Sequence, residues 1–354
     1  HVQDAGIDFL QGHASFLDAQ TLWVEERPVK ASKILIAVGA KPAKPNIPGT
    51  EHSITWHELY RLPTQPKSIA IIGGDPIGVK IAGSLNALGT QVTQVISEER
   101  ILPALDAEIS EEIQKRLINR GVQFFNKTPI AAIKKGDEGL CLIPKSTDGA
   151  SLSEPLTAEA VLMDTPRAPN LEGLNLDKAG IELTPSGAIR VDGFSHTSQE
   201  GVFAIGDCTE RIPLTPSAIA QGRAFADSEF GNKPSPATLA WVPISLSSHP
   251  EAATVGASEA EAQAQFGEAA ACYRAQFRPL LYCLAQGDEK TFIKVVVNRQ
   301  DQERVLGVHM VGDGAVEIVQ SLAVALKLGA TKYDLDSAIG IHPSSGEEIF
   351  ALTS

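Results

Sequence analysis

The sequence has 354 residues, of which 43% are hydrophobic, and a formal net charge of -13 at pH 7. A chain of this length is too long for one compact domain, so we expect several domains. The negative charge disfavours nucleic acid and anionic membranes as partners, because both are bound largely through Lys and Arg. No run of eighteen apolar residues occurs, so no membrane-spanning helix is predicted.

The four cysteines lie far apart and form neither a CxxC nor a CxxxxC pair; they are Cys141, Cys208, Cys272 and Cys283. No cluster of His and Cys has the spacing of metal ligands, so no metal site is predicted. The chain begins at His1 rather than Met and shows no signal peptide. We therefore expect a cytoplasmic protein and a further segment upstream of residue 1.

Residues 1–48 are predicted to form short strands that lead into a buried strand. The expected strands span residues 7–10, 12–16, 21–24 and 34–38. Prolines at 42, 45 and 48 then predict a stiff, extended connector, because proline lacks an N–H and disfavours a helix at the preceding residue. A domain boundary is expected at about this point.

Residues 49–165 are predicted to form a doubly wound α/β domain. The expected elements are a strand at 69–72, a glycine turn at 73–74, a helix at 77–88, a strand at 91–96, a helix at 108–119, a strand at 122–125 and an antiparallel flap at 131–143. A buried strand, a glycine turn, an amphipathic helix and a second strand in this order are typical of a βαβ unit.

The rest of the chain is predicted to contain two further segments. Residues 166–236, with a strand at 201–205 and a helix at 216–230, are interpreted as the return half of the first domain. Residues 237–354 are expected to form an α+β domain. Its main elements are strands at 291–297 and 305–311 and a long helix at 315–327.

Five phrases in the sequence, taken in order, resemble the pyridine-nucleotide disulfide oxidoreductases. They are residues 36–39 with Pro42, 201–207, 214–216, 248–256 and 342–348. Their separations match the family from the middle of its flavin domain to its C-terminus, and residues 328–332 are more similar to glutathione reductases than to dihydrolipoamide dehydrogenases. The resemblance implies a glutathione-reductase-like α/β fold, with FAD-binding and NAD(P)-binding domains and a C-terminal α+β dimerisation domain.

The resemblance also implies a homodimeric flavoprotein that passes electrons from NADPH or NADH through FAD to a disulfide such as glutathione disulfide. His342 occupies the position of the family's acid/base histidine, which serves the redox-active sulfurs of the partner subunit. Glu347 occupies the position of the glutamate that holds the tautomer of this histidine. Without the resemblance, a histidine before a proline is more often a capping or packing residue.

Three residues match flavin-binding positions of the family. Asp207, after Gly206, stands where a carboxylate accepts hydrogen bonds from a ribityl hydroxyl, although an ordinary helix N-cap would also favour Asp. Gly39 stands where the backbone passes close to the flavin nucleotide. The family's first βαβ unit and its CxxxxC dithiol precede this region, so we expect these 354 residues alone to bind FAD weakly and to perform no dithiol chemistry.

The nicotinamide fingerprint departs from the family pattern G-x-G-x-x-G. Gly73, Gly74 and Gly78 are present, but Asp75 replaces the second glycine of the pattern. A carboxylate at that place would repel the pyrophosphate by several kcal/mol. Binding of NADP or NAD in the manner of the family is therefore doubtful.

Other positions of the same site also differ from the family. Pro76 replaces an aromatic residue that shields the flavin, and Lys80 replaces an acidic residue. Ser97 and Pro103 stand where glutathione reductases have two arginines for the 2′-phosphate, and in the later phrase A-x-G-R-x-P the glycine is replaced by Pro166. These exchanges favour loss of nicotinamide use, although compensated drift would explain one or two of them.

Three hypotheses follow for the function. The first is an active disulfide reductase, the second is a non-catalytic or regulatory homologue that keeps the dimer scaffold, and the third is a retained flavin with a different electron donor. A CxxxxC after a GxGxxG in the upstream sequence would favour catalysis.

Overall fold

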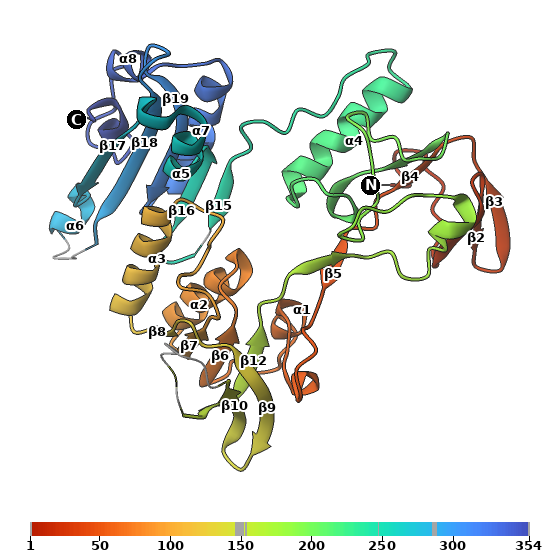
Figure 1. The fold of residues 1–354 in the computed structure, drawn as a ribbon, viewed down its shortest axis with the longest axis horizontal. Helices are drawn as coiled ribbons and strands as arrows, with labels where there is room; N and C mark the ends of the chain where they lie inside the picture. Colours follow the sequence, from red (N-terminus) through yellow and green to blue (C-terminus); the bar gives the residue numbers. More distant parts are fainter. Residues whose placement is uncertain (1, 146–151, 153, 247, 285–288, 353–354) are drawn as a thin grey trace. The chain divides into compact units, whose positions relative to one another are not determined.

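The computed structural model describes residues 2–145, 152, 154–246, 248–284 and 289–352, which form two compact units (Figure 1). Unit 1 comprises His1–Ala43 and Pro166–Leu239, and unit 2 comprises Lys44–Thr165 and Ala240–Ser354. The division into four segments with boundaries after residues 48, 165 and 236 stays a prediction. No helix of the described ranges is long and apolar enough to cross a membrane.

Unit 1 contains three small sheets. The antiparallel meander consists of β1 (Ala14–Asp18), β2 (Thr21–Val24) and β3 (Arg27–Lys30). The two other sheets pair β4 (Ile34–Ile36) in parallel with β14 (Val202–Ala204), and β5 (Ala40–Pro42) in antiparallel fashion with β13 (Arg167–Pro169). The remaining elements are η2 (Leu176–Ala179), η3 (Gly206–Cys208) and α4 (Thr215–Glu229). Chain segments far apart in sequence thus form one core, as predicted for a first domain with a return segment.

The strand predicted at residues 7–10 is wrong. These residues form no strand, and the side chains of Ile7, Phe9 and Leu10 are 56%, 64% and 40% exposed. An apolar run becomes a strand only where another strand pairs with it, and no strand of the described chain pairs with this segment. The strand expected at 34–38 likewise ends at Ile36, where its pairing with β14 ends.

The first half of unit 2 is the predicted doubly wound domain. Its parallel sheet has the order β12-β6-β7-β8 and consists of β6 (Ser68–Ile72), β7 (Gln91–Val95), β8 (Gln123–Phe125) and β12 (Ala160–Met163). The helices are α1 (Trp56–Leu59), α2 (Pro76–Ala87) and α3 (Ala107–Asn119), after η1 (Thr50–His52). The predicted flap is confirmed as the antiparallel sheet of β9 (Ile130–Gly136), β10 (Gly139–Pro144) and β11 (Leu156–Ala158).

The second half of unit 2 is an antiparallel sheet of order β15-β16-β19-β18-β17. Its strands are β15 (Ile244–Leu246), β16 (Ala252–Gly256), β17 (Ala270–Phe277), β18 (Thr291–Asn298) and β19 (Arg304–Val311). The helical elements are α5 (Glu259–Phe266), η4 (Gly267–Ala269), α6 (Leu280–Leu284), α7 (Ala315–Lys327), α8 (Lys332–Asp336) and η5 (Glu347–Phe350). Helix α7 packs its apolar face, including Val319 and Leu326, into the core of this sheet. The α+β fold predicted for this segment is confirmed.

A buried ionic cluster joins the two halves of unit 2. The Nζ atom of Lys294, in β18, lies 2.9 Å from Asp106 Oδ1, 2.5 Å from Glu108 Oε2 and 2.7 Å from Glu259 Oε2. Asp106 also caps α3 by accepting a hydrogen bond from the Glu108 N–H. Burial alone would raise the pKa of the Asp106 carboxyl, but the Glu259 N–H and the Lys294 ammonium hold it below its ordinary value.

We predict that Lys294→Met lowers the free energy of unfolding of unit 2 by about 3–5 kcal/mol, because it leaves the Asp106 carboxylate buried without a counter-ion. Denaturant unfolding near pH 7 measures the effect. Adding Asp106→Asn should recover much of the loss. The matched control is Lys127→Met, which breaks the exposed pair with Glu99 and should cost less than about 1 kcal/mol. Equal losses for Lys294→Met and Lys127→Met would contradict the role of the cluster.

Candidate functional site

His342 and Glu347 lie together at the C-terminal end of unit 2. The Nδ1 atom of His342 lies 3.0 Å from Glu347 Oε1 and 3.1 Å from Oε2, so the ring donates its Nδ1–H to the carboxylate. Ser344 fixes the glutamate further, because its N–H donates to Oε1 and its hydroxyl accepts from the Glu347 N–H. This contact selects the tautomer in which Nε2 carries the lone pair.

The histidine pair opens onto a hollow of about 470 Å³. Residues of α6 and the segment before it form one wall, including Pro279 and Leu280, and residues 342–348 contribute to the other. The imidazole side chain is 80% exposed, and no hydrogen-bond partner of its Nε2 lies among the described residues. This ring nitrogen is therefore available to exchange a proton with a group that enters the hollow.

The three flavin-position residues lie at one edge of unit 1. Gly39 and Gly206 follow β4 and β14, which are parallel neighbours, so both glycines lie at the carboxyl ends of these strands. Gly39 has a φ of 69°, and a Cβ added there would meet no atom within 4 Å, so this side of the backbone is open to a bound group. Gly206 has a φ of 73° and begins η3, which contains Asp207.

The Asp207 carboxylate is held by Arg167, which is the arginine of the A-x-G-R-x-P phrase. Its Nη1 donates to Asp207 Oδ2 at 2.6 Å, and its Nη2 donates to the Pro213 carbonyl oxygen at 2.8 Å. The contact orients the Asp207 carboxylate, and among the described residues its Oδ1 has no hydrogen-bond partner, so this oxygen can accept from a hydroxyl. The open side of Gly39 and this oriented carboxylate fit the ribityl side of a flavin.

The glycine turn between β6 and α2 packs tightly against the end of β12. Gly73 has a φ of 117°, and a Cβ there would lie 2.4 Å from the Asp164 carbonyl oxygen. A Cβ at Gly74 would lie 3.1 Å from Ile96 Cγ2, and one at Gly78 would lie 2.3 Å from Asp164 Oδ2. The three glycines are thus used for close packing inside the chain.

Asp75 and Pro76 begin α2 where a pyrophosphate would need backbone donors. Asp75 is the N-cap residue, but its side chain makes no capping hydrogen bond, and Pro76 removes an N–H from the first turn. Burial, and then the charge of Glu98, raise the pKa of the Asp75 carboxyl. The N-terminus of α2 therefore carries acidic groups and one donor fewer than an ordinary helix.

Asp164 packs against the glycine turn, and sequence reasoning assigned it no role. It directly follows the buried strand β12, is 7% exposed, and its Oδ2 has no hydrogen-bond partner among the described residues. Burial first, and then the charge of Asp75, raise the pKa of this carboxyl to about 8, against the opposite effect of the Gly78 and Asp75 N–H groups. A carboxylate at the end of a strand adjoining the glycine turn was the available signal.

The remaining predicted nicotinamide positions lie around the same end of the sheet. Lys80 lies on α2 and is partly buried, which lowers the pKa of its ammonium. Ser97 is exposed and donates to Glu98 Oε1 at 3.0 Å, and Pro103 is exposed as well. Within the described residues, no group of three or more His, Cys, Asp or Glu has the arrangement of a metal site.

Comparisons with known proteins agree with this arrangement. The family model described as pyridine nucleotide-disulphide oxidoreductase matches residues 1–222, and the model of the family's dimerisation domain matches residues 242–352. The glutathione reductase of Nostoc sp. is 42% identical over 99% of this chain and 78% of its own length. The glutathione reductase of Burkholderia cepacia is 37% identical over 99% of this chain and 76% of its own length.

Solved structures show the same fold. The Cu(II) complex of the HOCl-induced flavoprotein disulfide reductase RclA from Escherichia coli superposes with a TM-score of 0.88 at 25% identity, covering 98% of this chain and 79% of that chain. Together with the two matched family models and the identities above, this shows that the chain belongs to the pyridine nucleotide-disulphide oxidoreductase family.

Proposed function

We propose that the protein is a glutathione-reductase-like flavoprotein disulfide oxidoreductase that acts on glutathione disulfide or a close analogue. The observation that carries this proposal is the His342–Glu347 pair, whose Nε2 faces a hollow of about 470 Å³. Reduction of one disulfide consumes two electrons and two protons and releases two thiols. A histidine with a fixed tautomer is suited to deliver and accept these protons.

The cofactor of the proposal is FAD, for which Gly39, Gly206 and Asp207 would contribute the ribityl side of the site. Bound FAD would supply the two-electron redox centre. The role of this chain is to hold the ribityl hydroxyl on the Asp207 carboxylate, which Arg167 orients. Gly39 leaves room for the close approach of the backbone to the nucleotide.

We further propose that the site is completed in a homodimer. The dimerisation-domain match covers the segment that carries His342. Several large apolar side chains on this segment are exposed, which favours their burial against a second copy of the chain. They are Val324 at 64%, Leu328 at 83%, Tyr333 at 77%, Ile339 at 97% and Ile341 at 80%. A dimer of the kind that the family forms would place His342 next to the redox-active sulfurs of the second copy.

The second candidate is that the protein has no nicotinamide-dependent turnover. It would then either be non-catalytic or receive electrons from another donor. The observation that favours it is the start of α2, where the charge of Asp75 contributes to raising the pKa of the Asp164 carboxyl and the charge of Glu98 contributes to raising that of Asp75. A pyrophosphate approaching this turn would meet acidic side chains at a helix start from which Pro76 removes one backbone donor. We propose that nicotinamide binding is lost in this way.

We predict that His342→Gln and Glu347→Gln each lower kcat for glutathione disulfide by about 10²–10⁴-fold, because proton transfer to the leaving thiol is lost or misdirected. Thiol release by the full-length protein with FAD is measured with NADPH and, separately, with a chemical reductant of the flavin. The matched control is His57→Gln, exposed on α1. If neither His342→Gln nor Glu347→Gln lowered turnover, the proposed role of the pair would be contradicted. If the unmodified protein turned over with the chemical reductant but not with NADPH, an electron donor other than nicotinamide would be supported.

We predict that neither NADPH nor NADH binds with a dissociation constant below about 1 mM. Asp75→Gly with Pro76→Tyr should recover affinity for the shared pyrophosphate, and adding Ser97→Arg and Pro103→Arg should restore preference for NADPH. Calorimetry measures all three proteins. A micromolar dissociation constant for the unmodified protein would overturn the prediction. It would also be overturned if the four-residue variant bound no better than a variant with the other three substitutions but without Asp75→Gly.

The buried Asp164 carboxyl gives a prediction that needs no nucleotide. Its pKa of about 8 lies above the ordinary Asp value, so the folded state keeps this proton up to a higher pH than the unfolded state does. The free energy of unfolding should therefore fall as pH rises from the ordinary Asp range to about 8. Asp164→Asn should remove this slope and be more stable than the parent by roughly 5 kcal/mol at pH 8.5.

Denaturant unfolding at about pH 5 and about pH 8.5 measures this difference, which should be larger at the higher pH. The matched control is Asp137→Asn, on the exposed turn between β9 and β10, which should change neither value by more than about 0.5 kcal/mol. The same stability difference between Asp164→Asn and the parent at both pH values would show that the carboxyl does not titrate as described.

A further inference from the structure

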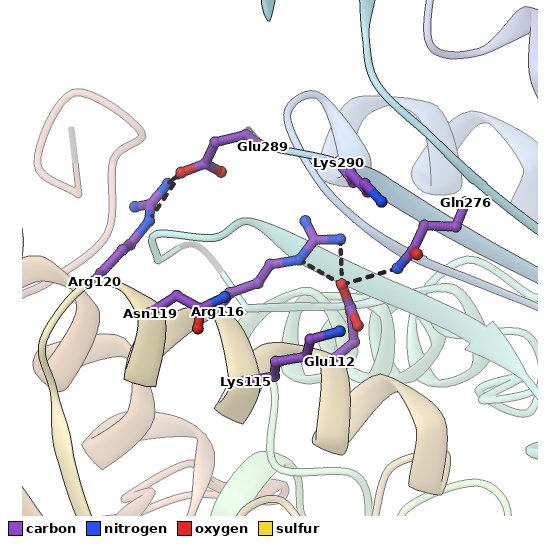
Figure 2. Close-up of a pocket in the computed structure, with 8 residues that line it drawn as sticks. All are labelled: Glu112, Lys115, Arg116, Asn119, Arg120, Gln276, Glu289 and Lys290. Carbon is purple, nitrogen blue, oxygen red and sulfur yellow. Dashed lines mark hydrogen bonds and ion pairs between the residues drawn. The ribbon is translucent and has the colours of Figure 1, made fainter. Parts of the chain in front are cut away.

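A second hollow, of about 410 Å³, lies between α3 and the C-terminal sheet within unit 2 (Figure 2). Five of its lining residues come from α3 and the residue after it; they are Glu112, Lys115, Arg116, Asn119 and Arg120. The other wall is formed by Gln276 at the end of β17 and by Glu289 and Lys290 just before β18. The hollow therefore has four cationic and two anionic side chains.

The floor of the hollow is a fixed, neutral pair. Arg116 is 8% exposed and donates from Nε and Nη2 to Glu112 Oε1, at 2.9 and 2.8 Å, and from Nη1 to the Val311 carbonyl oxygen. Gln276 Nε2 donates to the same Glu112 oxygen at 3.3 Å. The Glu112 charge is thus surrounded by donors, as Figure 2 shows, and repels an entering anion little.

The rim of the hollow carries unbalanced positive charge. Arg120 and Glu289 neutralise each other through contacts of 2.5 and 3.1 Å. Lys115 and Lys290 are exposed, come from opposite walls, and make no ion pair in the part of the chain that the structure describes. Two ammonium groups thus remain for a ligand, in a chain whose formal net charge is -13.

An adjoining hollow is lined by two basic and two acidic side chains, with Glu99 and Glu111 as the acids. It shares Lys115 and Asn119 with the first hollow and is also lined by Arg100. The Nε atom of Arg100 is buried and has no hydrogen-bond partner among the described residues. Because this atom lies beneath the surface, it does not face either hollow, and the charge available to a ligand comes from Lys115 and Lys290.

This place is distinct from the glycine turn. Helix α2 begins at the carboxyl end of β6, and α3 begins after the carboxyl end of its parallel neighbour β7. Helix α3 then runs back along the sheet, so its C-terminal half lies at the amino ends of the strands. The hollow and the glycine turn consequently lie at opposite ends of the parallel sheet.

The helix dipole explains only part of this charge pattern. Cations in the last turn of a helix stabilise its negative end, which accounts for Arg116 and Arg120. Lys290 lies on the opposite wall, outside α3, and gains nothing from that dipole. The dipole therefore does not account for the second ammonium group of the hollow.

We propose that this hollow binds a small phosphate-bearing anion with two or more negative charges. Both arginine forks in the hollow are already engaged with carboxylates, so the remaining donors are two ammonium groups and the Asn119 amide. Ammonium groups act as point charges and favour the dianionic phosphate over a carboxylate, which is better matched by a guanidinium fork. The bound anion links α3 to the C-terminal sheet.

The experiment is calorimetry of the full-length protein with inorganic pyrophosphate, inorganic phosphate and succinate at low ionic strength. Pyrophosphate should bind most tightly, and Lys115→Ala with Lys290→Ala should weaken it by at least about tenfold. The matched control is Lys134→Ala with Lys135→Ala, exposed on β9, which removes the same charge and should leave binding unchanged.

Thermal unfolding provides a second measurement, because an anion that links the two walls should raise Tm in the parent and control proteins but not in the Lys115/Lys290 variant. All four substituted lysines are exposed, so both variants should fold. No binding of pyrophosphate at millimolar concentration, equal weakening by both variants, or succinate binding as tightly as pyrophosphate would each overturn the proposal.

Discussion

The ammonium group of Lys294, buried among the carboxylates of Asp106, Glu108 and Glu259, fixes the start of α3 against β18. A buried charge of this kind is retained only with well-placed partners, because each ion loses its hydration. Asp106 is both the N-cap of α3 and the counter-ion, so helix formation and docking of the helix depend on the same carboxylate. The glycine turn, the histidine pair and the basic hollow all belong to the unit that this contact holds together.

A second buried lysine holds the C-terminal tail in the same unit. Lys332 is 2% exposed; its Nζ donates to the Leu352 carbonyl oxygen at 2.7 Å and lies 4.6 Å from the centre of the Tyr273 ring. Leu352 follows η5, which begins with Glu347, so the lysine ties the tail beyond the glutamate to the sheet. The orientation of the His342–Glu347 pair thus depends on packing that lies outside the family phrase.

Most of the secondary structure was predictable, because local patterns specify it. The strand, glycine turn and helix of β6 and α2, and the long helices α3 and α7, follow from hydrophobic period and turn residues. The strand expected at 7–10 was wrong because pairing is not a local property. Nothing in the sequence distinguishes Lys294 or Lys332 from solvent-facing lysines, since burial of a charge is decided by partners brought in from distant segments. For Asp164 the sequence offered its place at the end of a buried strand, but the position of that strand beside the glycine turn depends on pairing of β12 with β6.

The altered glycine turn and the retained histidine pair can change independently because they depend on different contacts. The turn is shaped by the packing of Gly73 and Gly78 against Asp164, whereas the histidine pair rests on Ser344 and the anchored tail. The flavin-position residues belong to the other unit. The proposed loss of nucleotide contacts at α2 would therefore leave the geometry of the His342–Glu347 pair intact. Such a chain can take electrons from a source that does not use the turn, or keep the scaffold without turnover. The residues proposed for proton transfer are the same in both cases, so the two cases differ only in whether the flavin receives electrons from another donor.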